Sequence, residues 1–310
     1  MQYIIGTREF QIEEPTAVTI GKFDGLHRGH MKLLDEVFRF RKAGMKTAVF
    51  TFETAPGSLM SGRMQTMITT NEERRRNLEQ AGIDYLVEYP FNTTVAHMSP
   101  EDFVRKVLTD QMHARAVIAG TDCSFGYKGA GNAALLRKLG PEYGFRAVIV
   151  DKLMDGDREI SSTYVREELA AGHIRKANEL LGYEYSISGE VVHGQHLGST
   201  LGFPTANILP PAQKHLPVFG VYLSETEVDG VWYPSLTNIG RKPTIEGLHP
   251  VSAETFLYDF DQSIYGKSIE VRMLDFFRPE MKFDSLNQLR AQVDSDKVRG
   301  RQEHEKRNRV

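Results

Sequence analysis

The sequence contains a single cysteine, Cys123, among its 310 residues. One cysteine cannot form an intrachain disulfide, and the histidines and Cys123 do not have the spacing of a structural zinc site. These two absences argue against a disulfide-rich secreted domain and against a zinc finger. We therefore expect a protein of the reducing cytoplasm.

Long apolar runs and an excess of charge are also absent. No segment approaches the roughly 18 apolar residues of a membrane-spanning helix, and the N-terminus turns polar too early for a signal peptide. The net charge of -3 gives no general attraction to nucleic acid or to an anionic membrane. The length suits two domains. The expected partners are small molecules, and a homo-oligomer is compatible with the sequence.

The first half alternates short apolar runs with helical patterns, which is typical of βαβ units around a buried parallel sheet. We expect an α/β, Rossmann-like domain over residues 1–183. The predicted strands are 17–20, 47–52, 84–89, 115–120 and 146–150, and the predicted helices are 31–44, 71–82 and 99–108.

The second half consists of β-rich runs separated by Gly, Pro and Asp, which predicts a mostly β barrel with a terminal helix over residues 184–310. The boundary is expected near 182–186. The chain becomes strongly charged after Asp296, so we expect its last dozen residues to fray or to form a solvated tail.

The segment GKFDGLHRGH (21–30) lies between a predicted strand and a predicted helix. Parallel sheets bind ligands at this edge. Gly21, Gly25 and Gly29 allow a tight turn and a close approach of the backbone to a bulky anion. The following helix offers unpaired N–H groups and the positive end of its dipole to phosphate.

His27 and His30 are three residues apart and can point the same way. Two imidazoles at this edge could donate hydrogen bonds to phosphate oxygens as negative charge develops at phosphorus. The alternative is that both histidines only cap the helix or pack against it while the glycines shape the turn.

The HxGH pattern resembles the signature of the nucleotidyltransferase superfamily. The longer GxFDGxHxGH form is similar to the FMN adenylyltransferase domain of bacterial bifunctional riboflavin kinase/FAD synthetases. Two further segments fall in the order of that family, AGTDCSFGYKGAGN at 119–132 and ISSTYVREEL at 160–169. In the first of them Cys123 stands where an aromatic residue is usual.

This resemblance implies in-line attack by the phosphate of FMN on the α-phosphorus of ATP, with Mg²⁺ present and no protein nucleophile. It gives catalytic roles to His27 and His30. Asp24 has two alternative roles, to bind the cation through water or to fix the turn by accepting backbone hydrogen bonds. The residues that the resemblance places near the nucleotide or the flavin are Gly21, Phe23, Asp24, Gly25, Asp122, Ser162, Thr163 and Arg166.

The segment 186–208 resembles the riboflavin kinase module, with a Gly-rich flap that leads into GFPTAN. Thr205 and Asn207 offer hard oxygen ligands suited to Mg²⁺. The resemblance implies that Gly202 binds the nucleotide and that Glu254 is the general base. It also places Arg278, near the start of the last helix, on the flavin side, with a solvated surface arginine as the alternative.

Ser199 stands in the flap where the family usually has a basic residue. The leading hypothesis is an enzyme that phosphorylates riboflavin to FMN and adenylylates FMN to FAD. One alternative is an FAD synthetase with an inactive or weak kinase domain. The other is a flavin-binding regulatory module without turnover.

Overall fold

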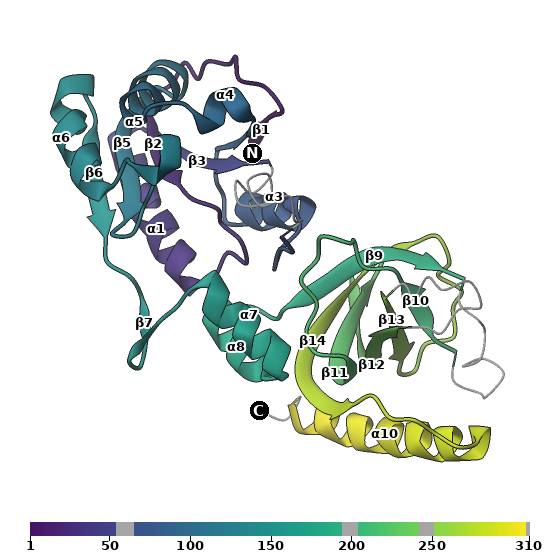
Figure 1. The fold of residues 1–310 in the computed structure, drawn as a ribbon. Helices are drawn as coiled ribbons and strands as arrows, with labels where there is room; N and C mark the ends of the chain where they lie inside the picture. Colours follow the sequence, from purple (N-terminus) through teal and green to yellow (C-terminus); the bar gives the residue numbers. More distant parts are fainter. Residues whose placement is uncertain (54–64, 194–203, 242–250, 308–310) are drawn as a thin grey trace. The chain divides into compact units, whose positions relative to one another are not determined.

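The computed structural model describes residues 1–53, 65–193, 204–241 and 251–307 (Figure 1). The chain divides into two compact units, Met1–Tyr164 and Val165–Val310. Each unit is described by itself.

The first unit is built on a six-stranded parallel sheet with strand order β1-β4-β3-β2-β5-β6. All five predicted strands are confirmed, and β1 is an additional edge strand. Every residue of β2 and β4 is buried, because helices cover both faces of the sheet. The strands are β1 (Gln2–Ile5), β2 (Thr16–Ile20), β3 (Lys46–Phe52), β4 (Tyr85–Tyr89), β5 (Ala114–Gly120) and β6 (Arg146–Val150).

Leu34 of α1 and Leu78 of α3 pack on one face of this sheet, and Val107 of η2 and Leu136 of α6 pack on the other. Thr70 is the N-cap of α3 and forms a reciprocal capping box with Glu73. The helical segments are α1 (Arg28–Arg39), η1 (Phe40–Ala43), α3 (Asn71–Gln80), α4 (Thr93–Ala96), α5 (Pro100–Asp102), the π-helix η2 (Phe103–Gln111), η3 (Tyr127–Gly129) and α6 (Ala133–Tyr143), and a hairpin of β7 (Met154–Asp155) and β8 (Arg158–Glu159) follows.

The topology places a switch point beside β2. The chain continues from β2 to β3 on one side, whereas β5 pairs with β2 on the other. The segments that follow β2 and β5 therefore leave the sheet from the carboxyl ends of neighbouring strands. In open α/β sheets ligands bind at this position.

The second unit contains a closed antiparallel barrel with strand order β10-β13-β12-β11-β14-β9, as predicted. Two helices precede it and one follows it (Figure 1). These elements are α7 (Ser162–Ala171), which begins in the first unit, α8 (Ile174–Leu181), β9 (Ser186–Val192), β10 (Ala206–Ile208), β11 (Gly220–Val228), β12 (Val231–Arg241), β13 (Val251–Leu257), β14 (Ser268–Pro279) and α10 (Leu286–Arg307).

Hydroxyl groups fill part of the barrel interior. Ser224 is hydrogen-bonded to Ser235 and to Thr237 at 2.8 Å, and Thr237 is hydrogen-bonded to Thr255 at 2.9 Å. All four residues are fully buried. Satisfied buried hydroxyls are specific about their partners, so they help to set the pairing of β11, β12 and β13.

The prediction of a frayed tail is wrong, because α10 continues as a helix to Arg307. Asp296, Gly300 and His304 are four residues apart and form its buried stripe. Ring atom Nε2 of His304 lies 3.1 Å from the carbonyl oxygen of Ser235 in the barrel. The stripe contains no apolar side chain, so the sequence pattern did not reveal it.

The two compact units part at 164, whereas the boundary predicted from sequence is 183. Between these positions lies α8, whose Asn178 donates a hydrogen bond to the carbonyl of Met273 at 2.9 Å. Arg175 of α8 also pairs with Asp275 at 2.6 Å. The domain boundary at 183 stays a prediction.

Candidate active sites

The loop after β2 combines a strained backbone with buried anchors. Phe23 and Leu26 have φ angles of 48° and 38°, which bulky residues rarely adopt. Both side chains are buried in the core beneath α1 and α3, and this burial holds the strained turn in place. The fully buried ring of Phe23 leaves only the backbone of this predicted binding residue to meet a ligand.

His27 and His30 lie together at the start of α1. Their rings stack with centroids 3.8 Å apart, and Nδ1 of His27 accepts a hydrogen bond of 3.4 Å from the backbone N–H of His30. In neutral His27 the proton is therefore on Nε2. A side chain at Gly29 would begin 3.1 Å from the ring of His27 and 3.3 Å from the carbonyl of Ile160, which explains the glycine.

Burial makes both imidazoles neutral at pH 7. It lowers the pKa of His27 to about 4. The pKa of His30 lies well below its ordinary value, mainly because of burial and to a smaller extent because of the neighbouring His27. Nδ1 of His30 is buried and has no hydrogen-bond partner in the part of the chain that the structure describes. A phosphate oxygen at this position would supply one.

Asp24 connects the loop to a distant segment. Its Oδ1 accepts hydrogen bonds from the N–H groups of Ile68 at 2.7 Å and Thr69 at 3.3 Å. The N–H of Gly25 donates to the hydroxyl of Thr69 at 3.1 Å, and the hydroxyl of Ser162 donates to the carbonyl of Asp24 at 2.8 Å. These bonds correspond to the turn-fixing role of Asp24.

The start of α7 thus reaches the same loop through Ser162. The cap of this helix is Ser161, whose hydroxyl accepts the N–H of Tyr164 at 3.2 Å. Thr163 is exposed, and Arg166 lies one turn into the helix and is half-buried. The start of α7, which the resemblance places near the nucleotide or the flavin, is therefore joined to the histidine loop through Ser162.

Asp122 follows β5, next to the switch point. It is largely exposed and pairs with Lys152 at 3.1 Å, and Lys152 also pairs with Glu159. The sequence analysis did not identify Lys152. Its position two residues after the end of β6, at the carboxyl edge of the sheet, could have indicated it as a candidate site residue. Burial, with a smaller effect of Asp122, raises the pKa of Cys123 to about 11, so this thiol stays protonated at neutral pH.

The second group of predicted residues meets on the barrel. Asn207 of β10 is the register partner of Glu254 of β13, and Glu254 is in turn the partner of Asn238 of β12. Directly paired residues of antiparallel strands point to the same face. The structure therefore brings the predicted metal ligand Asn207 beside the predicted base Glu254.

The oxygens of Thr205 and Asn207 fit Mg²⁺. Nδ2 of Asn207 donates to the carbonyl of Thr205 at 3.4 Å, which orients the amide. Within residues 1–53, 65–193, 204–241 and 251–307 no group of three or more His, Cys, Asp or Glu side chains could hold a metal. Mg²⁺ commonly takes one or two protein oxygens and completes its shell with phosphates and water. Gly202 and Ser199 lie outside the described residues.

Arg278 lies in β14 and precedes α10. Its Nε and Nη2 donate hydrogen bonds of 2.8 Å and 2.7 Å to Oδ2 of Asp296 in α10, and Gln292 donates to the other carboxylate oxygen. The side chain of Arg278 is only 16% exposed. It is therefore a positioned arginine and not a solvated one.

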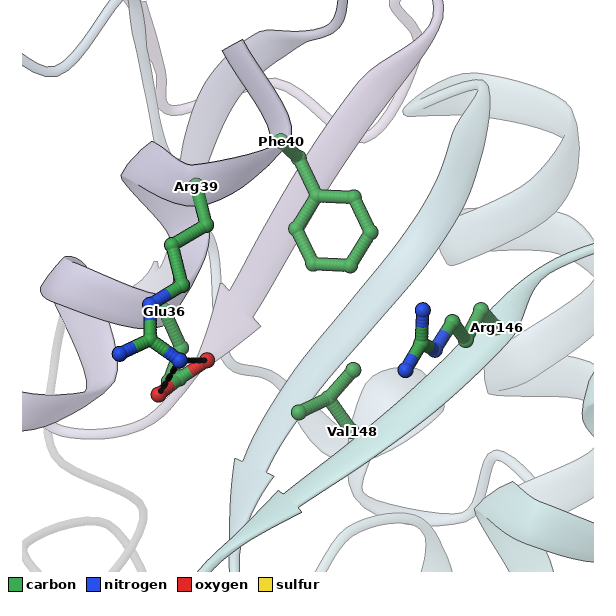
Figure 2. A pocket seen from close by; sticks show the side chains of 5 residues that line it. All are labelled: Glu36, Arg39, Phe40, Arg146 and Val148. Atoms are coloured by element: carbon green, nitrogen blue, oxygen red, sulfur yellow. Dashed lines mark hydrogen bonds and ion pairs between the residues drawn. The ribbon is translucent and has the colours of Figure 1, made fainter. Parts of the chain in front are cut away.

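A cavity of about 270 Å³ lies elsewhere, between the end of α1 and the start of β6 (Figure 2). Arg39 pairs with Glu36 on one side, and Arg146 and Val148 lie on the other. Arg39 ends the helix that His27 and His30 begin, about 16 Å away along the axis. This cavity belongs to neither candidate site.

The fold is an α/β unit with a topological switch point followed by a unit built on a closed β-barrel. Two family models match in the same order, FAD synthetase over residues 9–164 and riboflavin kinase over residues 181–303. The chain belongs to the bifunctional riboflavin kinase/FMN adenylyltransferase family, and the predicted family is confirmed.

Relatives match along nearly the whole length. The bifunctional riboflavin kinase/FMN adenylyltransferase of Listeria monocytogenes is 34% identical over 90% of this chain and 89% of its own. The Escherichia coli K12 protein of the same name is 36% identical over 94% and 93%. A crystal structure titled as a macrolide-efflux protein from Streptococcus pneumoniae is 29% identical, with a TM-score of 0.84 over 97% of this chain and 98% of that one. None of the helices described in this chain has the length and apolar character needed to cross a membrane.

Proposed function

We propose that the chain phosphorylates riboflavin with ATP to give FMN, and then transfers an adenylyl group from a second ATP to FMN to give FAD and pyrophosphate. The observation that carries this proposal is that each unit gathers its own set of predicted residues. The stacked pair His27 and His30 lies at the switch point of the sheet, and Asn207 lies beside Glu254 on the barrel.

In the first unit the neutral imidazoles donate hydrogen bonds to phosphate oxygens as charge develops on the α-phosphate of ATP. The oxygen of the FMN phosphate attacks that phosphorus, and pyrophosphate leaves. Asp24 holds the loop through its backbone partners. Gly21, Gly25, Asp122, Ser162, Thr163 and Arg166 bind the nucleotide and the flavin.

In the second unit Glu254 takes the proton from the terminal ribityl hydroxyl as that oxygen attacks the γ-phosphorus of ATP, and ADP leaves. Thr205 and Asn207 would hold Mg²⁺, which neutralises phosphate charge when it is bound. Arg278, held by Asp296, lies on the flavin side, and Gly202 binds the nucleotide.

The relatives' names favour both activities over a single one, and nothing observed favours a binding module without turnover. We also propose a cytoplasmic location, which the lone Cys123 supports. The partners are ATP, riboflavin, FMN and FAD, without nucleic acid or membrane, and a homo-oligomer stays a proposal.

The test is to incubate the purified protein with ATP and Mg²⁺, separately with riboflavin and with FMN, and to separate the flavins by chromatography. FAD from both substrates is expected. FAD from FMN alone would leave only the adenylyltransferase. Absence of FAD in both reactions would contradict the proposal.

A further inference from the structure

Lys152 is a cation at the edge of the sheet that carries the first candidate site. It follows β6 by two residues, Asp122 follows β5 by two residues, and the histidine loop follows β2. β6 is the parallel neighbour of β5, and β5 is the parallel neighbour of β2 (Figure 1). Because the carboxyl ends of parallel strands meet at one edge, Lys152 and Asp122 lie on the side of the sheet where this kind of fold binds ligands.

Two carboxylates cover the ammonium group of Lys152. Its Nζ lies 3.1 Å from Oδ2 of Asp122 and donates a hydrogen bond to Oε2 of Glu159. The side chain of Lys152 is 31% exposed, whereas those of Asp122 and Glu159 are 67% and 51% exposed. The pKa of Lys152 is raised, mainly by the hydrogen bond to Glu159, so this side chain is charged at pH 7.

A short hairpin holds Glu159 against the start of α7. The hairpin pairs β7 with β8. The guanidinium of Arg158 lies 3.8 Å from the centroid of the Tyr164 ring, and the hydroxyl of Tyr164 donates a hydrogen bond to Asp155 at 3.1 Å. Lys152 therefore joins the loop after β5 to the segment that opens α7. Both segments belong to the proposed adenylyl-transfer site.

The charge of this cluster bears on the proposed substrates. One ammonium group faces two carboxylates, so Lys152 offsets only part of the negative charge. ATP and FMN are both anions, and a carboxylate that loses its cation repels them more strongly. Ion pairs as exposed as this one contribute little to folding stability. The contribution of Lys152 is therefore to local charge and to the orientation of Asp122.

From these contacts, and resting on the proposed adenylyl transfer, we infer that Lys152 is a positioning residue of the first site, which holds Asp122 in place and offsets its charge so that the anionic nucleotide can bind. Lys152 acts through Asp122 and not on the reacting phosphorus. Its loss should therefore weaken substrate binding and leave the chemical step nearly unchanged.

The experiment measures KM for ATP and kcat during FAD formation from supplied FMN. Lys152→Met removes the charge at similar length, and Lys152→Arg keeps it. Both are also made in an Asp122→Asn background, to measure the coupling of the two positions. Lys138→Met, at an exposed position of α6, is the matched control. FMN formation from riboflavin by each variant reports whether the chain is folded.

Lys152→Met should raise KM for ATP by about 3-fold to 10-fold, the size of one charge screened by water and salt. It should change kcat by less than about 2-fold. Lys152→Arg should recover most of the loss, and Lys138→Met should change neither parameter. In the Asp122→Asn background Lys152→Met should raise KM by less than about 2-fold.

An unchanged KM in Lys152→Met, an equal rise of KM in both backgrounds, or a fall of kcat in place of the rise of KM would overturn the inference. Each of these results leaves the adenylyltransferase function standing. If the unsubstituted protein forms no FAD from FMN, the proposed function itself fails, and the role of Lys152 fails with it.

Discussion

At the scale of single residues, burial decides what the two site histidines can do. The enclosed stack of His27 and His30 disfavours the charged imidazolium, so in the proposed reaction both rings would act as neutral donors. A phosphate anion beside them reverses part of this effect, because an opposite charge favours the protonated form. The rings are thus suited to respond to charge that develops on a substrate.

The lowered pKa of His27 predicts a stability that depends on pH. The unfolded state takes up a proton near pH 6.5 and the folded state only near pH 4, so stability present at pH 7 is lost as the pH falls between these values. His27 alone should lower the free energy of unfolding of the first unit by about 2 kcal/mol between pH 7 and pH 5.

The measurement is urea unfolding by circular dichroism at both pH values. The only tryptophan, Trp232, lies in the barrel, so its fluorescence follows the second unit separately. His27→Gln should reduce the pH dependence of the first unit. His113→Asn, just before β5 at the amino ends of the strands, should preserve the pH dependence. An unchanged pH dependence in His27→Gln would contradict the lowered pKa of His27.

The sequence indicated candidate residues for this site but not the contacts that surround them. The glycines and histidines of 21–30 were identifiable because their spacing is local. The buried ring of Phe23, the partners of Asp24 at 68–69 and the pairing of Lys152 with Asp122 depend on segments far apart in the chain. Local patterns carry no information on such contacts.

At the scale of elements, α3 is fastened to the sheet by a buried ion pair. Glu88 of β4 is fully buried and pairs with Arg74 and Arg75 of α3, with Nε of Arg75 at 2.8 Å. Glu88→Gln would leave Arg74 buried without its opposite charge. The first unit should lose about 3–5 kcal/mol of stability.

Urea unfolding by circular dichroism checks this loss. The exposed Glu72 of the same helix supplies the control, since Glu72→Gln should change stability by less than about 1 kcal/mol. Equal effects of the two substitutions would show that the buried pair is not what holds α3.

The contact of α10 with the barrel depends on Gly300. A side chain at this position would begin 2.5 Å from the hydroxyl of Tyr258 and 2.9 Å from Leu236, and that hydroxyl donates a hydrogen bond to the carbonyl of Lys297. Alanine favours a helix over glycine by about 1 kcal/mol. The crowding should outweigh this gain, so Gly300→Ala should destabilise the second unit by about 1–2 kcal/mol.

Trp232 fluorescence during urea unfolding reports this change. Val298→Ala, at a 62% exposed position of the same helix, should lie within about 0.5 kcal/mol of the unsubstituted protein. A stabilised Gly300→Ala variant would mean that helix propensity dominates and that α10 does not pack closely.

Strands with continuous apolar runs, such as β3 and β4, were predictable because burial on both faces leaves a plain pattern. The edge strand β1 is mostly exposed and offered no such signal. The end of α10 was mispredicted for a related reason, since its buried stripe consists of Asp296, Gly300 and His304 and contains no apolar side chain.

At the scale of the whole molecule, the change from a βα series to β-rich runs was enough to predict two different folds in one chain. The order of strands within each sheet was beyond the sequence, because it depends on pairings such as β2 with β5 and β10 with β13. Those pairings create both sites. The switch point comes from the first and the juxtaposition of Asn207 with Glu254 from the second.

The central claim is that two separate sites catalyse consecutive reactions. The most direct measurement is the rate of FMN formation from riboflavin and of FAD formation from supplied FMN, in His30→Ala and in Glu254→Gln. His30→Ala should slow the adenylyl transfer about 100-fold or more and leave FMN formation intact. Glu254→Gln should slow FMN formation by about 100-fold or more and leave FAD formation intact. Loss of both reactions in either folded variant, or of neither, would contradict the account.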